Sequence, residues 1–539
     1  MTVSIQDAES LNGDKEVVHQ ETLPTYTHDE KSKDWNDTAV KAMVATTDSE
    51  HTMTGWEAFQ LYKKAVGWSL IVSAAVIMEG YDTALLGALY GFPAFQKQFG
   101  QPFGDGYEIS AAWQTALSMG TNIGVVIGVF INGIMTEKLG HKRMMLISLA
   151  TITLCIFVPF FSTTAPVLFV GEVLCGIPWG VFSTLAPAYA SEVCPVALRG
   201  YLTTYVNLCW VTGQLIASGV LDSLQGRSDE WAYKLPFAIQ WVWPVPLFCA
   251  LCFAPESPWW LVRQDRREDA KKSLDRLSTL SPEENERMVA EMVRTNHYET
   301  EITKGTSYKD CFRGSNLRRT EICCSVWAIQ TLCGSPIMGY ATYFFEQAGL
   351  DTSSAYALGV SQYGFGFIGT LLAWVLLAHF GRRTIYLGGL VFMNTMLFLI
   401  GILAVIPGNN SVIPWASSVV LLLFVFAYDL SVGPVCFALV SETSSTRLRG
   451  KTISLARNTY NLFYIIFGAA TPYMLNPTAL NWKGKVGFFW GGLCFLCTVW
   501  TYYRLPEPKG RTYEELDIMF ENKVDARAFK KYVVEDIPE

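Results

Sequence analysis

Long runs of apolar residues, separated by polar stretches, follow one another along most of the chain. Twelve of these runs have about 20 residues or more, which is the length that crosses a bilayer as a helix. They lie near 65–91, 111–136, 144–163, 166–190, 201–222, 232–254, 321–346, 354–380, 384–406, 413–440, 452–475 and 484–504. The pattern therefore predicts an all-α integral membrane protein with twelve transmembrane helices.

A charged segment divides these spans into two halves. Residues 65–254 and 321–504 hold six spans each, and the segment 255–320 lies between them. Its stretch "REDAKKSLDRLS" is typical of an amphipathic surface helix, and Ser281 followed by Pro282 is typical of a helix start. We therefore expect a small intracellular helical domain between two six-helix transmembrane halves.

Lys and Arg residues concentrate in the loops on one side of the predicted membrane. Besides those of the charged segment, they are Lys138, Lys142, Arg143, Arg199, Arg382, Arg383, Arg447, Arg449 and Lys451. Because cytoplasmic loops carry such an excess, both termini are predicted to be cytoplasmic. Residues 1–64 then form a polar, disordered tail without a signal peptide, and 505–539 form a cytoplasmic C-terminal tail. The same orientation places the N-glycosylation sequon at Asn409 outside the cell.

Several loop sequences of the first half return in the second. "YASEVCPVALRG" ends at Gly200, and "LVSETSSTRLRG" ends at Gly450, 250 residues later. "PESP" at Pro255 and "PEPKG" at Pro506 have nearly the same offset, and "EKLGHKR" at Glu137 is partly repeated by "HFGRR". A nearly constant offset for several motifs in one order indicates that each half is a copy of one six-helix unit.

These repeated motifs, with "PESPWWL" and "PEPKGRTYEELD", resemble the sugar porter family of the major facilitator superfamily over nearly all of 60–520. The stretches "MEGYDTALLGALYGFPAF", "GEVLCGIPWGVF" and "CGSPIMGYATYFFEQAG" are similar to fungal α-glucoside (maltose-type) permeases. The monosaccharide branch of the family usually has Arg where this chain has Glu172. The resemblance implies a plasma-membrane symporter that imports α-glucosides such as maltose together with protons, by alternating access.

The resemblance also implies a cytoplasmic gate made of ion pairs between helix ends. The charged motif residues expected to form it are Glu137, Arg143, Glu192, Arg199, Glu256, Arg382, Arg383, Glu442, Arg449 and Glu507. Such pairs would hold the cytoplasmic side shut and would break when it opens. The second half has Ala378 where an acid is usual, so its pairs should be weaker. A purely topogenic role is the alternative, since surface ion pairs contribute little.

Polar and aromatic side chains inside the spans are candidates for binding a sugar. A sugar needs amide and hydroxyl groups for its hydroxyls and aromatic faces for its C–H surfaces, near the midplane between the halves. The candidates are Gln214, Gln330, Tyr340, Phe437, Asn458 and Asn461. The family usually has Gln at Thr331 and Asn at Pro336, so its monosaccharide contacts do not transfer directly. Packing between helices is the alternative role.

Glu79, Asp82 and Arg457 are ionisable residues inside predicted spans. A carboxylate at the bilayer centre costs about 2.5–3.5 kcal/mol, so function is the default expectation. By resemblance, Asp82 matches the proton-linked aspartate of sugar symporters. Glu79 matches an acid seen with it in α-glucoside permeases, and Arg457 matches their buried arginine. Those permeases carry a third acid in span 2, where Asn122 aligns. A static buried ion pair is the alternative.

Composition and spacing argue against other functional classes. Half of the 539 residues are hydrophobic, the net charge is −7, and nothing indicates a nucleic-acid partner. The 13 cysteines and six histidines lack metal-ligand spacing. Ser445 stands where a phosphate-binding loop would need its first glycine, and we find no catalytic triad. We therefore expect neither an enzyme nor a bound metal or cofactor.

Three alternatives to the α-glucoside symporter stay open. They are a facilitator, a symporter for another sugar such as glucose, cellobiose or lactose, and a sugar sensor. Sensors of this family usually carry a long C-terminal extension, and only about 35 residues follow the last span here. We expect a monomer whose partners are the sugar, a proton and the lipid bilayer. Lys31 and Lys33 are candidate targets of ubiquitin-ligase machinery at the N-terminal tail, with an inert tail as the alternative.

Overall fold

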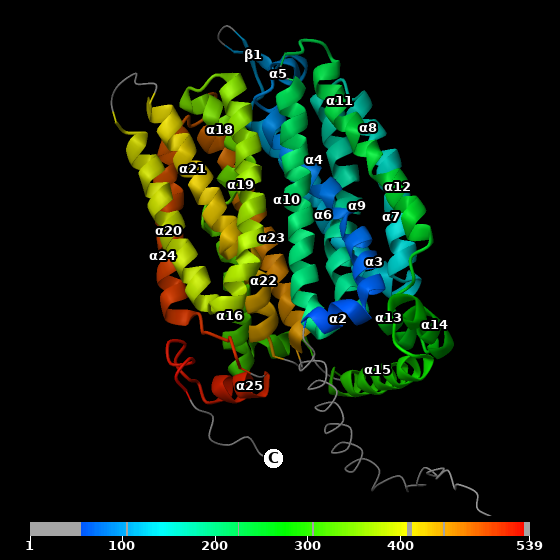
Figure 1. Ribbon diagram of the computed structural model, residues 1–539. Coiled ribbons are helices and arrows are strands. Elements are labelled where there is room, and N and C mark those ends of the chain that lie inside the picture. Colours follow the sequence, from blue (N-terminus) through cyan, green and yellow to red (C-terminus); the bar gives the residue numbers. More distant parts are fainter. Residues whose placement is uncertain are drawn as a thin grey trace, which may run out of the picture. The chain divides into compact units, whose positions relative to one another are not determined.

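Helices joined by short loops make up most of the computed structural model (Figure 1). It describes residues 55–532 except 104–105, 225, 304–306, 407–411, 446–447 and 512. These residues belong to one compact unit, Met53–Glu539. The sequon at Asn409 and the tail residues Lys31 and Lys33 lie outside the described residues, and so do the side chains of Arg199 and Arg449.

The six predicted spans of the first half are all helical. Their helices are α3 (Lys63–Ser73) with α4 (Val76–Leu89), α6 (Ala111–Leu139), α7 (His141–Cys155) with α8 (Phe157–Phe161), α9 (Ala165–Val193), α10 (Val196–Leu224), and α11 (Trp231–Ile239) with α12 (Pro244–Cys252). The shorter elements are α2 (Gly55–Leu61), α5 (Pro93–Phe99), the strands β1 (Gln101–Phe103) and β2 (Gly106–Glu108), and the 3-10 helix η1 (Gln240–Val242). The two strands pair antiparallel, with Gln101 opposite Glu108.

The second half repeats this arrangement with two broken spans. Its helices are α16 (Gly314–Leu332), α17 (Pro336–Gly339) and α18 (Ala341–Ala348), α19 (Thr352–His379), α20 (Arg382–Leu403), α21 (Val412–Leu430) with α22 (Val432–Thr443), α23 (Arg449–Leu475) and α24 (Val486–Arg504), preceded by η4 (Lys483–Lys485). Between the halves lie α13 (Pro258–Arg263), α14 (Arg267–Leu277), α15 (Pro282–Thr303) and η2 (Tyr308–Phe312), and α25 (Tyr513–Glu521) follows the last span. The division into five domains stays a prediction.

By length and composition, nine helical segments of the described residues could cross a membrane. The other predicted spans are α10, the broken set α16–α18, and α23. They are helical too, but they are less apolar because they carry side chains such as Gln214, Gln330 and Asn461. Spans that line a polar path between the halves lose hydropathy in this way.

Helices α6 and α9 touch along a seam of small residues. A Cβ added at Gly124 would lie 2.2 Å from the Val173 carbonyl oxygen, and one added at Gly180 would lie 2.2 Å from the Val125 carbonyl oxygen. Such distances leave no room for a methyl group. Small residues spaced four apart allow this backbone approach, which holds membrane helices together by close packing. The first half therefore has a tightly packed interior beside α4.

The two halves meet mainly along two helix pairs, α10 with α19 and α6 with α23, and smaller contacts join α4 to α17 and α18 and α10 to α22. Figure 1 shows the β1–β2 hairpin and α5 at one end of the bundle, and α13, α14, α15 and α25 at the other. We call these the hairpin end and the loop end. The breaks in the second half have local causes. Gly334, with φ +103°, precedes α17, and Pro434 removes a backbone donor just after α21 ends.

Candidate functional site

A buried carboxylate lies at the centre of the predicted proton-coupling group. Asp82 on α4 is 4% exposed. Its Oδ1 accepts a hydrogen bond of 2.8 Å from the Gln240 side-chain amide, and its Oδ2 accepts one of 3.2 Å from the Trp179 indole N–H. Both donors are neutral, so they orient the carboxyl group without a cation that would fix it as an ion. The arrangement can hold a proton and release it.

Glu79 lies one turn before Asp82 and faces the third predicted member of the group. Glu79 and Arg457 interact electrostatically, although α4 and α23 belong to different halves. The Arg457 guanidinium also lies 4.7 Å from the Trp327 ring centre and 4.8 Å from that of Tyr460. Aromatic faces attract a cation placed over them. The three predicted residues are therefore neighbours, with Arg457 acting on Glu79.

Glu172 is a fourth ionisable residue of this group, and the sequence pointed to it only as a subfamily marker. It lies on α9 and is 1% exposed. Its Oε2 accepts a hydrogen bond of 2.7 Å from the Thr121 hydroxyl on α6, and its charge interacts with that of Asp82. The signal that could have found it was present, because an acid inside a predicted span is a functional candidate by default.

Two of the predicted sugar-binding amides are buried. The Gln330 amide donates a 2.9 Å hydrogen bond to the Gly433 carbonyl oxygen, just after the break in span 10. In this conformation its carboxamide oxygen can accept a hydrogen bond from a sugar hydroxyl, and its second amide hydrogen can donate one. Gln214 on α10 is buried as well. On α23, Asn458 is exposed and Asn461 is half-buried.

The predicted aromatic residues differ in their surroundings. Tyr340 is buried, its ring stacks on that of Tyr90 at 6.0 Å, and its hydroxyl is 2.9 Å from the Ser118 hydroxyl. Phe437 is 46% exposed and packs edge-on against Trp327, with ring centres 4.9 Å apart. Tyr340 thus already joins the two halves, whereas Phe437 presents an open aromatic face.

Further contacts close the hairpin end between the halves. Glu108 on β2 accepts a 3.0 Å hydrogen bond from the Tyr343 hydroxyl on α18. The Asn476 amide donates to the Ile109 carbonyl oxygen at 3.0 Å. Burial raises the pKa of Glu108 to about 7, and the bond from Tyr343 opposes this rise. This cluster was not predicted from the sequence, because its residues lie far apart along the chain and come together only in the fold.

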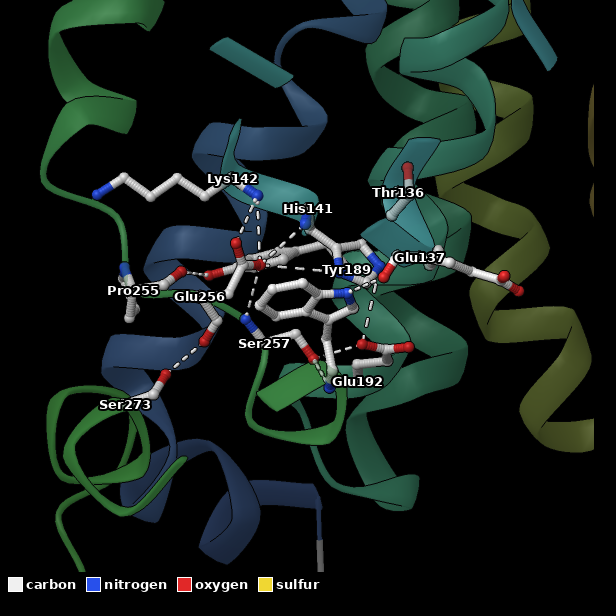
Figure 2. Close-up of polar contacts among 12 residues, drawn as sticks. Thr136, Glu137, His141, Lys142, Tyr189, Glu192, Pro255, Glu256, Ser257 and Ser273 are labelled. Atoms are coloured by element: carbon white, nitrogen blue, oxygen red, sulfur yellow. Dashed lines mark hydrogen bonds and ion pairs between the residues drawn. The ribbon is translucent and has the colours of Figure 1, made fainter. Parts of the chain in front are cut away.

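At the loop end, Glu256 binds the start of α7 (Figure 2). Its carboxylate accepts hydrogen bonds from the backbone N–H groups of His141 at 3.0 Å and Lys142 at 3.2 Å. Burial raises its pKa, and the bonds from Ser257, Lys142 and His141 oppose this rise. Gly140 makes the approach possible, because its φ is +89° and a Cβ there would lie 2.5 Å from the carboxylate.

The second half has the same contact between a carboxylate and the start of a helix, formed by its own copy of the motif. Glu507 accepts hydrogen bonds from the backbone N–H groups of Arg382 at 2.8 Å and Arg383 at 3.1 Å, at the start of α20. A Cβ at Gly381 would lie 2.0 Å from the Glu507 carboxylate. The first residues of a helix leave backbone N–H groups without partners and carry a partial positive charge, which a carboxylate satisfies. The internal repeat therefore extends to local geometry.

Ion pairs complete each motif within its own half. Arg382 binds Glu442 at 3.0 Å in the second half. In the first half, Glu192 binds Arg263 at 2.6 Å, and the Ser257 hydroxyl donates to the same carboxylate. Arg382 and Glu442 were both candidates from the sequence, although not as a specific pair, whereas Arg263 was not a candidate because it lies in the charged segment outside the repeated motif.

Two predicted gate residues are placed differently from the expectation. The Glu137 side chain is exposed, and it is the Glu137 backbone carbonyl that accepts bonds from Trp260 at 3.0 Å and Gln264 at 3.1 Å. Figure 2 shows the Glu137 side chain pointing away from Glu256. Arg143 is exposed. Among the described residues, no group of three or more His, Cys, Asp or Glu side chains is arranged to hold a metal ion.

Residues 68–520 match the family described as "Sugar (and other) transporter". The chain belongs to this family. General alpha-glucoside permease of Saccharomyces cerevisiae is 42% identical over 517 residues, which cover 93% of this chain and 83% of the permease. Maltose permease MAL31 of the same species is 41% identical over 518 residues, covering 94% and 84%. The predicted family and its α-glucoside permease branch are confirmed.

Solved structures with the same fold include the xylose transporter XylE from E. coli. Its partially occluded inward-open conformation has a TM-score of 0.68 and 20% identity, and the match covers 84% of this chain and 99% of that one. The proton:xylose symporter XylE bound to 6-bromo-6-deoxy-D-glucose has a TM-score of 0.67 and 22% identity, covering 85% and 99%. The predicted major facilitator fold is confirmed, and the chain is a multi-pass membrane protein.

Proposed function

We propose that this chain is a proton-coupled transporter that imports α-glucoside disaccharides such as maltose. The observation that carries the proposal is the buried Asp82, held by neutral donors in a chain that is over 40% identical to α-glucoside permeases. A static ion pair would need a cation bonded to this carboxylate. The amide of Gln240 and the indole of Trp179 occupy that position instead.

Asp82 carries the proton in this proposal, and Glu79 and Arg457 tune it. Asp82 takes a proton from the more acidic side and releases it on the other. One proton crossing 100 mV gains about 2.3 kcal/mol, enough to concentrate a neutral sugar about fiftyfold. Arg457 acts on Glu79 from the opposite half, so the tuning changes when the halves move apart.

The sugar binds between the halves in this proposal. Gln214, Gln330 and Asn461 supply hydrogen bonds to the sugar, and Phe437 supplies an aromatic face. Asn458, on the same helix as Asn461, supplies a further hydrogen bond. The positions of these residues support this site. Gln214 on span 5 and the two asparagines on span 11 lie on helices that contact the other half. Gln330 on span 7 and Phe437 on span 10 lie on spans whose helices are interrupted. Replacing Gln214 or Gln330 by Ala should weaken sugar binding by about 1 kcal/mol each.

The motif carboxylates hold the ends of the helices during alternating access. Glu256 and Glu507 keep the starts of α7 and α20 rigid, while Glu192 with Arg263 and Glu442 with Arg382 tie the loop end of each half together. The loop end can then separate without breaking either half. Arg199 and Arg449 belong to the proposed gate by motif.

The location and the partners are proposed on the same basis. We place the chain in the plasma membrane as a monomer, with both termini cytoplasmic and Asn409 outside. Ubiquitin ligases would act on the N-terminal tail. Labelling of single cysteines in intact cells tests the orientation. Asn409→Cys should be modified from outside and Ser281→Cys should be protected, and the reverse result contradicts this topology.

The deciding experiment measures sugar-induced proton uptake and sugar accumulation in transport-deficient yeast at matched surface expression. Asp82→Asn should abolish accumulation and keep exchange of sugar down its gradient, since Asn keeps the shape but cannot titrate. Arg457→Ala should be more damaging than Glu79→Gln, because it leaves a buried acid without its cation. Asp229→Asn, at an exposed acid in the loop that follows α10, is the control and should keep both activities. If proton uptake persists in Asp82→Asn, another residue carries the proton. If the unmodified protein shows no sugar-induced proton uptake, it is a facilitator or a sensor.

A further inference from the structure

Glu172 is a buried acid to which the proposed mechanism assigns no role. It lies on α9, the helix that packs most tightly against α6, and its Oε2 accepts the 2.7 Å bond from Thr121. The glycine seam fixes the distance between these two helices. A Cβ at Gly176, one turn after Glu172, would lie 2.3 Å from the Thr121 carbonyl oxygen. The carboxyl group is therefore held in one position rather than left to reach solvent.

The groups around Glu172 include another acid but no described cation. Its electrostatic neighbours are Asp82 on α4, the Tyr90 hydroxyl just after the end of α4, and Cys175 on α9. Its hydrogen-bond donor, Thr121 on α6, is neutral. Arg457 is a described cation of this group, and it interacts electrostatically with Glu79, one turn before Asp82.

Trp179 links the two acids along α9. It lies seven residues after Glu172, which is two helical turns, so both side chains occupy the same face. Helical side chains lean toward the N-terminus, so the indole reaches back from Trp179 toward the turn of Cys175. Its N–H donates to Asp82. Cys175 lies between the two and interacts electrostatically with both acids.

We propose that Glu172 is a second proton-coupling residue, which holds the transported proton jointly with Asp82. Two buried carboxylates close to each other repel when both are ionised, so the pair binds one proton tightly and shares it. The pair is a dianion when empty. It takes up one proton from the more acidic side, becomes a monoanion, and returns to the dianion when that proton leaves on the other side. This inference rests on the proposed proton-coupled function and assigns one of its residues.

The test is the pH dependence of sugar accumulation in Glu172→Gln, measured on the full-length protein in yeast with maltose as the sugar. Removing one carboxyl group removes the repulsion that makes the empty pair bind a proton tightly. The midpoint of the pH profile should therefore move to lower pH by about one unit. Glu172→Asp, which keeps the acid, should restore most of the original midpoint. A merely structural role predicts reduced surface expression and an unchanged midpoint.

Thr121 provides a second and opposite test that keeps Glu172 intact. Thr121→Val removes the hydroxyl that stabilises the ionised carboxyl, so the midpoint should move to higher pH, by about half a unit. Thr121→Ser keeps the hydroxyl and should leave the midpoint unchanged. This pair remains informative if Glu172→Gln fails to reach the surface.

The outcomes separate this inference from the function on which it rests. Loss of proton uptake in the unmodified protein contradicts the symporter itself. Proton uptake with a midpoint that neither Glu172→Gln nor Thr121→Val moves contradicts only the pair, and it leaves Asp82 as the single carrier. Asp229→Asn controls for the loss of an acidic side chain outside the pair and should not move the midpoint.

Discussion

The two ends of the molecule use their polar groups in opposite ways. At the hairpin end, Tyr340 and Tyr343 of the second half are hydrogen-bonded to Ser118 and Glu108 of the first. At the loop end, the described bonds of the motif carboxylates stay within one half, as for Glu256 and Glu507. The hairpin end is therefore closed by bonds that opening must break. The loop end is built from two self-contained pieces that can part without losing their internal bonds.

The largest effect should come from breaking one self-contained piece at the loop end. Gly140→Ala would strain a backbone at φ +89° and push a Cβ against the Glu256 carboxylate. We expect about 3 kcal/mol of destabilisation, from the strain and from the loss of bonds to a charged group. Thermal unfolding of the purified protein in detergent measures it.

A matched comparison in the second half sharpens this prediction. Gly381→Ala meets the Glu507 carboxylate but has no unusual φ, so its cost should be smaller than that of Gly140→Ala. Gly388→Ala in the same helix, α20, has open space around its Cβ and should be neutral or slightly stabilising. Equal melting temperatures for all three variants would show that the carboxylate caps are not structural.

A smaller effect should follow at the hairpin end from Tyr343→Phe, which removes the bond to Glu108. The loss of one buried bond, about 1 kcal/mol, should shift the balance between closed and open hairpin ends about fivefold toward open. The distance between spin labels on Lys97→Cys and Leu480→Cys, one in each half, reports this balance. Tyr107→Phe, at an exposed tyrosine of the hairpin, is the control and should leave the distances unchanged. An unchanged distribution in Tyr343→Phe would mean that packing alone closes this end.

The pH response of the same label pair tests Glu108. Its pKa is about 7 when the hairpin end is closed, against an ordinary value of 4.5, which we expect once the group is hydrated in an open state. The closed state therefore binds the proton more tightly. Its extra stability is fully present below about pH 4.5 and is lost as the pH rises through about 7. Glu108→Gln should keep the label distances of acidic conditions up to pH 8. The same pH response with Gln in place would exclude Glu108 as its source.

The smallest effect should come from the ion pair between Arg263 and Glu192, because the arginine is 42% exposed. Arg263→Gln should cost about 0.5 kcal/mol, and added salt should reduce the cost further. The melting temperature in low and high salt measures it, with Arg263→Lys as the charge-preserving control. A loss as large as that of Gly140→Ala would mean that ion pairs, and not carboxylate caps, hold the loop end.

The sequence predicted most of the fold, because long apolar runs and a repeated motif are local signals. Ser281 and Pro282 likewise marked the start of α15 correctly. The contacts of the site were harder to predict. Gln240 and Trp179 reach Asp82 from other spans, and such pairings depend on how helices rotate against one another.

The carboxylate caps were missed for a different reason. Because the sequence motifs were interpreted as charge pairs, Glu256 and Glu507 were predicted to bind arginine side chains. Their carboxylates instead bind backbone N–H groups, which every residue except proline has and no sequence pattern reveals.

Tyr340 makes the choice of sugar and the opening of the hairpin end inseparable. The same phenol that is a candidate sugar contact also forms the bond to Ser118 across the halves. Laboratory selection for a new substrate that changes this tyrosine will change turnover at the same time. Substitutions of Tyr340 that allow transport of a new sugar should therefore occur together with compensating substitutions of Ser118. Substitutions of Phe437 that allow transport of a new sugar should need no such second change.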